Sequence, residues 1–479
     1  MARINTNTAA ILAGRQLNRS YTQLSTSLER LSSGLRINRG ADDPAGLIVS
    51  ENLRSEMGGV RQAIANSQRA ANVVATTEGA LNEVASLLSD IQAKIIEAAN
   101  VGAVSDDEIK ANQLQIDSAV ESITRIANTT SFAGRKLLNG SLGYVTSGVN
   151  ASEITDLRVN GVSFGTAAYM PVNVSVTQSA QHAALQFQTS TITDDLTIEL
   201  AGANGVTTLT LLSGTHASAI MQAINLVSDA TGVSASLINA SNAASGITLN
   251  SIAYGTDAFV QVEEIGTAGV FTTVDTDGQQ VKRDEGRDIS ATVNGANTLG
   301  KALDLFLNTS GLSLELKIQE AFNSVGTSSF AITGGGATFQ LGGGVDTNQQ
   351  VNIGVDSTTA SRLGSGSVGY LSQITSGGEY SLVAGQSAQA AKIIEEAVRQ
   401  VSVLRGRLGA FEKNTLDTNM SQLQITLENL TASESSIRDV DYASEVSNLT
   451  RTQILVSAGT SILGIANQTP QSVLALLQG

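Results

Sequence analysis

The sequence predicts a mainly α-helical fold with an α+β insert. Both chain termini should form a long antiparallel helical bundle or coiled coil, with one or two β-rich outer domains inserted between them. Apolar residues recur every three or four positions in residues 1–140 and 384–479, and they alternate every second position in parts of residues 141–383. Because an apolar helical seam needs a partner, we expect the seams at the two chain ends to pack on each other.

Composition narrows the possible functions. Hydrophobic residues make up 41% of the 479 residues and aromatic residues only 4%, so the cores must consist mainly of aliphatic and small side chains. The chain has no cysteine, which excludes disulfides and thiolate chemistry. Residues 141–383 hold 7 Lys and Arg against 20 Asp and Glu. Such an acidic segment repels nucleic acid and anionic membranes, so we expect no nucleic-acid partner and no membrane insertion.

The first helix is predicted to be short and to end in a break. Its apolar residues follow alternating spacings of four and three, the pattern of a seam along another helix: Leu17, Tyr21, Leu24, Leu28, Leu31 and Leu35. Gly34 and Gly40 then interrupt the helix within residues 34–43. Asp43 is a good N-cap and Pro44 stands at the favoured first helical position, so a second helix should begin there.

The remaining helices follow from the same reasoning. The second helix should run from Pro44 to Asn100, roughly 85 Å, and a third should begin after the N-cap Ser105. In the C-terminal part a heptad seam reaches Phe411 and resumes after a shift of one residue, which changes the supercoil without ending the helix. Pro470 should break the last helix before a short final turn.

Strands and turns are predicted between the helical ends. Residues 196–200 and 209–211 alternate on either side of the turn sequence GANG, which is typical of a hairpin. A short helix near 220–227 and strands near 233–238 and 247–252 should follow, and residues 312–318 alternate again. We interpret this region as one or two small α+β domains.

Motifs for catalysis are weak, so we expect no enzyme, no cofactor and no catalytic or metal-binding residue. His182 and His216 are 34 residues apart, without the spacing of a metal site. The glycines at 364, 366 and 369 satisfy GxGxxG, but no strand clearly precedes them and the following segment is too short for a phosphate-binding helix. We interpret them as a flexible loop.

The apolar C-terminal segment is the strongest functional signal. It ends with Val473, Leu474, Leu476 and Leu477, and the short N-terminal helix can cover only one side of it. Leaving each of these residues exposed would forfeit about 1.5–3 kcal/mol. We therefore predict burial between molecules, with folding back onto the chain's own bundle as the alternative.

Long stretches at both ends resemble bacterial flagellins. They are INTNTAAI at 4–11, LSTSLERLSSGLRINRGADDPAGLIVSENLRSEM at 24–57, TTEGALNEV at 76–84, RGRLGAFEKNTL at 405–416 and SEVSNLTRTQILVSAGTSILGIANQTPQSVLALLQG at 444–479. Residues 195–262 are similar to the β-rich hook-IN motif found in some flagellins.

The resemblance implies a division into domains. Residues 1–33 and 437–479 would form an inner terminal coiled coil, and residues 34–43 a spoke with Gly34, Gly40, Asp43 and Pro44 as its turn and cap residues. Residues 44–140 and 384–436 would form an outer helical bundle. Residues 141–383 would be a β-rich, acidic, surface-exposed insert.

The resemblance also implies a structural subunit that polymerises into the bacterial flagellar filament for swimming motility. The expected partners are further copies of the chain in a helical homopolymer, the flagellar export apparatus, an export chaperone, and the cap and hook-filament junction proteins. The chain would be secreted without a cleavable signal. The expected interface residues are Ile4, Ile11, Leu12, Leu17, Tyr21, Leu24, Leu28, Leu31, Leu449, Ile454, Leu455, Ile462, Leu463, Ile465, Val473, Leu474, Leu476 and Leu477.

Two alternative functions and one departure from the family stay open. The chain could be a hook-filament junction protein, or an adhesin or glycan-binding surface protein on a flagellin frame. Flagellins that animal innate receptors detect present a basic and aliphatic helix face at the segment matching residues 88–97. Asp90 and Lys94 replace the basic and leucine residues of that face, and Gln115 replaces an acidic residue, so we expect weak receptor activation.

Overall fold

The computed structural model describes residues 6–477 apart from 166, 267–269 and 310, and it describes no side chain at 243 or 469–477. The described chain forms two compact units. Long helices made by the two chain ends enclose a β-rich middle region in the sequence, so the predicted fold class is confirmed. None of the described helices combines the length and apolar character that a membrane span requires.

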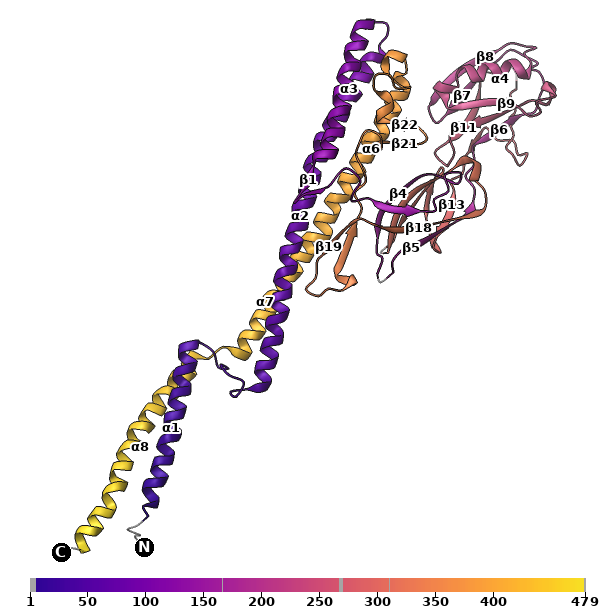
Figure 1. The fold of residues 1–479 in the computed structure, drawn as a ribbon. Helices are drawn as coiled ribbons and strands as arrows, with labels where there is room; N and C mark the ends of the chain where they lie inside the picture. Colours follow the sequence, from indigo (N-terminus) through magenta and orange to yellow (C-terminus); the bar gives the residue numbers. More distant parts are fainter. Residues whose placement is uncertain (1–5, 166, 267–269, 310, 478–479) are drawn as a thin grey trace. The chain divides into compact units, whose positions relative to one another are not determined.

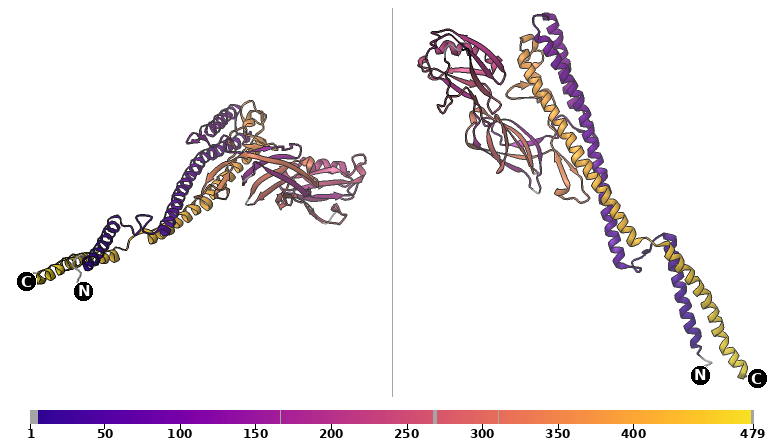
Figure 2. Two further views of the ribbon diagram at one scale, coloured as in Figure 1. Left: turned by 60° about the horizontal axis from the view of Figure 1, so that its bottom comes forward. Right: turned by 180° about the vertical axis from the view of Figure 1, so that it is seen from behind.

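The first unit contains the chain ends. It extends to Arg69, adds Gln340–Gln349 and resumes at Lys413. Its helices are α1 (Thr8–Ser33), the beginning of α2 (Pro44–Ala99), α7 (Thr418–Arg438) and α8 (Tyr442–Leu477). Figures 1 and 2 show α1 and α8 side by side and antiparallel.

Capping residues set the helix boundaries close to the predicted positions. Gly34 ends α1 in the left-handed conformation with φ 74°, and its N–H donates to the carbonyl of Arg30 at 2.8 Å. Asp43 Oδ1 accepts from the N–H of Gly46 at 2.9 Å at the start of α2. Ser105 and Glu108 form a capping box at the start of α3 (Asp106–Thr129). The predicted helix starts at Pro44 and after Ser105 are confirmed.

The predicted one-residue shift in the C-terminal seam is a π-helical segment. Helix α6 (Ser387–Phe411) continues into η6 (Glu412–Asp417), which is π-helical, and then into α7. A π-helical turn holds one extra residue, so Phe411 and Leu416 are both buried although they are five positions apart. The helix passes the shift without a break, as predicted.

The second unit contains Ala70–Phe339 and Gln350–Glu412, that is, the rest of α2, then α3, α6 and the insert. The insert has two hydrophobic cores. The first lies between two antiparallel sheets with strand orders β14-β13-β5-β18-β3 and β15-β16-β17-β4. Their strands are β3 (Tyr144–Ser147), β4 (Ile154–Val162), β5 (Met170–Gln178), β13 (Ser290–Val293), β14 (Ala296–Asn297), β15 (Leu299–Lys301), β16 (Asp304–Asn308), β17 (Leu312–Ile318) and β18 (Gly326–Gly335).

The second core is α+β. Sheets β12-β11-β7-β8 and β6-β10-β9 enclose it together with α4 (Ala217–Leu226). The predicted hairpin is β7 and β8, whose register pairs Gly202 with Gly205. The elements are β6 (Ala184–Phe187), β7 (Leu196–Gly202), β8 (Gly205–Leu211), α5 (Ser228–Thr231), β9 (Val233–Leu237), η1 (Ala243–Ser245), β10 (Ile247–Ser251), β11 (Phe259–Ile265) and β12 (Arg283–Glu285).

The second core includes the helix α4 and so fits the α+β expectation, whereas the first core lies between two facing sheets. Short elements complete the chain. They are β1 (Ser131–Phe132), β2 (Arg135–Lys136), η2 (Glu320–Phe322), β19 (Ala337–Gln340), η3 (Thr347–Gln349), β20 (Gln350–Ile353), β21 (Gly364–Ser365), β22 (Gly369–Tyr370), η4 (Leu371–Ile374) and η5 (Leu382–Ala384).

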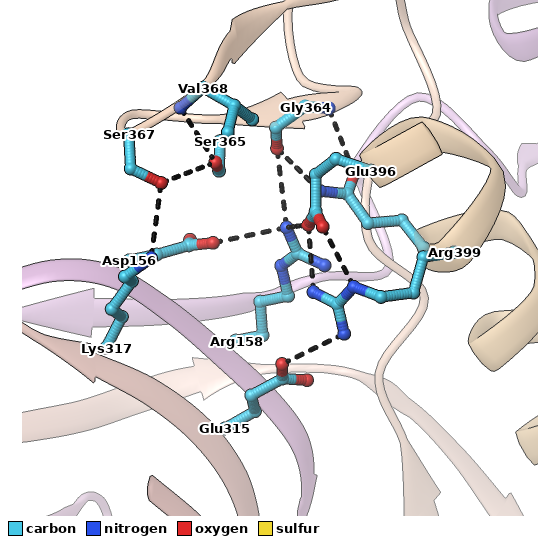
Figure 3. A network of polar contacts seen from close by, with 11 residues as sticks. Asp156, Arg158, Glu315, Lys317, Gly364, Ser365, Ser367, Val368, Glu396 and Arg399 are labelled. Carbon is cyan, nitrogen blue, oxygen red and sulfur yellow. Dashed lines mark hydrogen bonds and ion pairs between the residues drawn. The ribbon is translucent and has the colours of Figure 1, made fainter. Parts of the chain in front are cut away.

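A polar network joins the first sheet pair to α6 (Figure 3). Arg158 on β4 lies 3.5 Å from Glu396 on α6 and 3.2 Å from Asp156. Arg399 lies 2.8 Å from Glu396 and 3.4 Å from Glu315 on β17. Burial alone would raise the pKa of Glu396, but hydrogen bonds and the charges of both arginines hold that pKa below its ordinary value. These charge-assisted bonds fix the insert to the helix that precedes η6.

Candidate assembly interface

The seam between α1 and α8 is narrow and contains many small or polar side chains. On α1 the inward residues are Ala10, Ala13, Leu17, Ser20, Leu24, Ser27 and Leu31. On α8 they are Glu445, Leu449, Thr452, Val456, Gly459, Leu463 and Ala466. Gly459 allows close approach, because a Cβ at this position would lie 3.1 Å from Cδ1 of Leu17. The seam therefore mixes leucines with small and polar residues along its length.

The predicted seam of α1 was wrong at Tyr21, Leu28 and Leu35, and Leu35 lies beyond the end of the helix at Ser33. Ser20 and Ser27 are buried against α8, whereas Tyr21 and Leu28 are 48% and 51% exposed. The helix therefore carries two adjacent stripes, one toward α8 and one directed outward. The larger apolar side chains at positions 21 and 28 belong to the outward stripe.

Most of the predicted interface residues on the described chain are exposed. They are Ile11 (55%), Leu12 (63%), Tyr21, Leu28, Ile454 (63%), Leu455 (43%), Ile462 (56%) and Ile465 (66%). Together with Val446 (48%), which the sequence reasoning missed, we call them the outward apolar set. Soluble proteins rarely expose so many large apolar side chains on two neighbouring helices.

Five other predicted interface residues lie in the seam within the chain. They are Leu17, Leu24, Leu31, Leu449 and Leu463. Ile4 and the side chains of Val473, Leu474, Leu476 and Leu477 lie outside the described residues. The outward apolar set is therefore the part of the predicted interface that the structure leaves available to another molecule.

A groove on α8 is part of this exposed surface. Its walls are formed by Val446, Ser447, Thr450, Arg451, Ile454 and Leu455. The spacing of Val446, Thr450 and Ile454 follows one helix face at every fourth position. The exposed apolar residues thus form a shaped surface along α8.

Pro470 does not break the last helix as predicted. Helix α8 continues from Tyr442 to Leu477. Proline removes the N–H that would donate to the carbonyl of Ala466, and Asn7 supplies a substitute, because its Nδ2 donates to that carbonyl oxygen at 2.7 Å. The break was predicted from local sequence, whereas the substitute donor comes from the other end of the chain.

The spoke, residues 34–43, pairs with the short link between α7 and α8. Leu35 and Asp439 form an antiparallel bridge. The N–H of Arg36 donates to the carbonyl of Arg438 at 2.7 Å, and the N–H of Val440 donates to that of Gly34 at 3.0 Å. The connection from α1 to α2 and the connection from α7 to α8 are therefore tied to each other.

Side chains at the two ends of the spoke hold its shape. The Asp42 carboxylate accepts from the N–H groups of Arg39 and Asn38, and these bonds hold the pKa of Asp42 below its ordinary value. Ile37 is 1% exposed. Gly40 has no positive φ, and a Cβ there would lie an ordinary 3.6 Å from Leu47, so nothing in the structure explains a glycine at 40.

The three residues of the expected receptor-facing surface lie on α2 and α3. Asp90 and Gln115 are exposed. Lys94 is half-buried and its Nζ donates to Glu97 Oε2 at 2.9 Å. The side chain that replaces the expected leucine is thus engaged with an acidic neighbour.

The groups considered for chemistry have structural surroundings. Within the described residues no cluster of three or more His, Asp or Glu side chains could hold a metal ion. The predicted flexible loop with the GxGxxG pattern is wrong in one respect, because β21 and β22 form a hairpin there. The carbonyl of Gly364 accepts from Gln400 at 2.6 Å and from Arg158 at 3.4 Å, so the hairpin belongs to the polar network on α6.

Comparisons with known proteins cover both helical ends and part of the insert. Residues 4–142 match the family described as the bacterial flagellin N-terminal helical region, and residues 391–477 match the bacterial flagellin C-terminal helical region. Residues 195–253 match the flagellin hook IN motif.

Full-length relatives extend this similarity. A flagellin from Salmonella muenchen is 30% identical over 514 aligned positions, which cover 99% of this chain and 99% of the relative. The B-type flagellin of Pseudomonas aeruginosa is 30% identical over 502 positions with the same coverage. Among solved structures, the flagellar hook associated protein-3 of Legionella pneumophila is 13% identical, with 81% of this chain and 98% of that chain covered and a TM-score of 0.32.

Proposed function

The chain belongs to the bacterial flagellin family and is a structural subunit of the flagellar filament, and we propose that it polymerises by burying the outward apolar set against neighbouring copies. It is a structural protein of motility and not an enzyme. Its primary partner is itself, because flagellins assemble into the filament.

The observation that carries the proposal is the exposure of large apolar side chains on α1 and α8, beside a seam in which leucines are mixed with small and polar residues. Ser20, Ser27 and Thr452 are buried in the seam. Larger apolar side chains, such as those of Ile454 and Ile462, are exposed outside it. Full burial of one such apolar side chain contributes about 1.5–3 kcal/mol. Several of them together supply a driving force for association that the chain cannot use alone.

Helical growth of the filament follows if the contact between copies joins two different surfaces. The outward apolar set lies on two antiparallel helices, α1 and α8. If it packs on a different surface of the next copy, the contact is heterologous and does not close, so copies add without limit along a helix. In this proposal α1 and α8 form an inner layer, residues 34–43 a spoke, and the helices within 44–140 and 384–436 an outer layer.

The remaining partners and the location are part of the proposal. The chain would pass through the flagellar export apparatus with an export chaperone, and would reach the cell exterior by secretion. It would meet the cap and the hook-filament junction proteins at the ends of the filament. The acidic insert, with its 20 Asp and Glu against 7 Lys and Arg, would face the surrounding water.

Deletion of residues 444–479 is the first test. The truncated chain should remain a soluble monomer that cannot elongate filament seeds, because it loses most of the outward apolar set. Normal elongation would contradict the proposal. A junction protein, the alternative, would bind to filament ends but would not elongate seeds even at full length.

A matched pair of point variants separates assembly from folding. Ile454→Ala removes an outward side chain and should weaken elongation, whereas Val456→Ala lies two positions away in the seam and should affect mainly the pairing of α1 with α8. Equal effects of the two variants on elongation, or a larger effect of Val456→Ala, would contradict the assignment of the outward face.

A further inference from the structure

Asn7 bonds to both terminal helices at once. Its Oδ1 accepts from the N–H of Ala10 at 3.0 Å and so caps α1. Its Nδ2 donates to the carbonyl oxygen of Ala466 on α8 at 2.7 Å. An asparagine amide carries one acceptor and two donors, so the two bonds use opposite ends of the same group.

The carbonyl that Asn7 reaches has a special position in α8. In an α-helix the carbonyl of residue 466 would accept from the N–H of residue 470, but residue 470 is proline and has no N–H. The helix nevertheless continues to Leu477. Pro470 thus leaves one free acceptor on α8, and the side chain of Asn7 occupies it.

Three contacts define the register of α1 on α8. They are Asn7 with Ala466 at one end, Leu17 with Gly459 in the middle, and Arg30 with Glu445 at 3.8 Å beside the spoke. From Asn7 to Arg30 the first helix advances 23 residues while the second goes back 21 from Ala466 to Glu445. The contacts therefore describe one antiparallel alignment along the whole pair.

The small side chains of the seam discriminate poorly between registers. Ser20, Ser27 and Thr452 are small side chains, and the hydroxyl of Thr452 bonds within its own helix. A slide by one helical turn would move the outward residues of α1 by about 5.4 Å relative to those of α8. A neighbouring copy that fits both helices at once would then lose its fit.

Pro470 leaves the carbonyl of Ala466 without a donor from its own helix. We infer that the hydrogen bond from Asn7 to this carbonyl, called the lock below, sets the register of α1 on α8 for assembly. Asn7 is a positioning residue, since it acts through the placement of the outward apolar set. The inference rests on the proposed burial of that set between copies.

The central variant is Asn7→Asp. Aspartate caps a helix as well as asparagine does, so the bond from the N–H of Ala10 is kept. A carboxylate has no N–H to donate, and one of its oxygens would oppose the oxygen of Ala466. Asn7→Asp should raise the critical concentration for seeded elongation by roughly tenfold.

Pro470→Ala supplies the test of mechanism. Alanine at 470 restores the N–H that can serve the carbonyl of Ala466 from within α8. In the Pro470→Ala background, Asn7→Asp should therefore change the critical concentration by no more than about twofold. The lock is refuted if Asn7→Asp has no effect in the natural chain, or if it has the same effect in both backgrounds.

A cross-link reports the register directly, because the chain has no cysteine of its own. A Cβ built on Gly459 lies 3.8 Å from the Cβ of Leu17, which is the usual separation in a disulfide. In soluble full-length chains, the pair L17C/G459C should cross-link readily. Asn7→Asp should slow this reaction and favour the pair L17C/L463C, one turn further along α8. Unchanged cross-linking of both pairs would overturn the inference.

These results are separable from a failure of the proposed function. If Ile454→Ala leaves elongation unchanged, the outward apolar set is not the interface, whatever Asn7 does. If Ile454→Ala weakens elongation but Asn7→Asp and Pro470→Ala are not coupled, only the lock is wrong.

Discussion

Replacement of Ile462 by alanine should weaken filament growth about tenfold. Ile462 lies on α8 and is 56% exposed in the single chain. The substitution removes three carbons, or about 2.4 kcal/mol on full burial at about 0.8 kcal/mol each. Because roughly half of that area remains to be buried on assembly, the expected loss is about 1.3 kcal/mol for each subunit added, close to a tenfold rise in critical concentration.

The assay is seeded elongation over a series of monomer concentrations, followed by light scattering. Alanine favours the helix at least as well as isoleucine, so the soluble chain should keep its helical circular dichroism signal. Leu226→Ala is the matched control, since Leu226 is 87% exposed on α4 in the insert. A change below about twofold for Ile462→Ala, or an equal change for both variants, would refute the reasoning.

Three further predictions concern the remaining features. The pKa of Glu396 lies below its ordinary value, so its carboxylate stabilises the fold above that ordinary value, and this contribution is lost as pH falls through the folded pKa. Glu396→Gln should cost about 1–2 kcal/mol near neutral pH and weaken the fall of the thermal unfolding temperature at acid pH. An unchanged fall at acid pH would count against the network. Gly46→Ala should loosen the start of α2, because the new Cβ would lie 2.5 Å from Asp43 Oδ2; hydrogen exchange in the first turn should accelerate, and slower exchange would contradict this. In an innate-receptor reporter assay the natural chain should signal weakly and the triple variant D90R/K94L/Q115E more strongly, whereas a strong signal from the natural chain would contradict the expectation.

Helix boundaries could be predicted because their signals are local. Asp43 and Pro44 fix the start of α2 through one side chain and one ring, and Ser105 with Glu108 does the same for α3. The shift between Phe411 and Leu416 likewise indicated a local change of supercoil within a continuous helix, and the structure has the π-helical η6 there. In each case the residues that cause the feature lie within one or two turns of it.

The two faces of α1 could not be separated from the sequence. Tyr21 and Leu28 fit a heptad seam as well as Ser20 and Ser27 do in spacing, and greater hydrophobicity favoured the wrong pair. In a chain built for assembly, the most apolar stripe need not face the chain's own partner helix. Hydrophobic periodicity reports that a face is buried, but not which molecule covers it.

The prediction at Pro470 failed for a different reason. A proline within a helix is expected to break or kink it, since one carbonyl loses its donor. Here the donor is Asn7, which is 459 residues from Ala466 in sequence. Asn7 caps the first helix, but only the fold brings its remaining N–H to the other helix.

The burial of the outward apolar set can be measured with a single introduced cysteine. In an Ile454→Cys chain, the thiol should react readily with a maleimide while the chain is soluble and at least about tenfold more slowly in assembled filaments, whereas Leu226→Cys should react in both states. Equal labelling of Cys at 454 in soluble chains and in filaments would contradict the proposed interface.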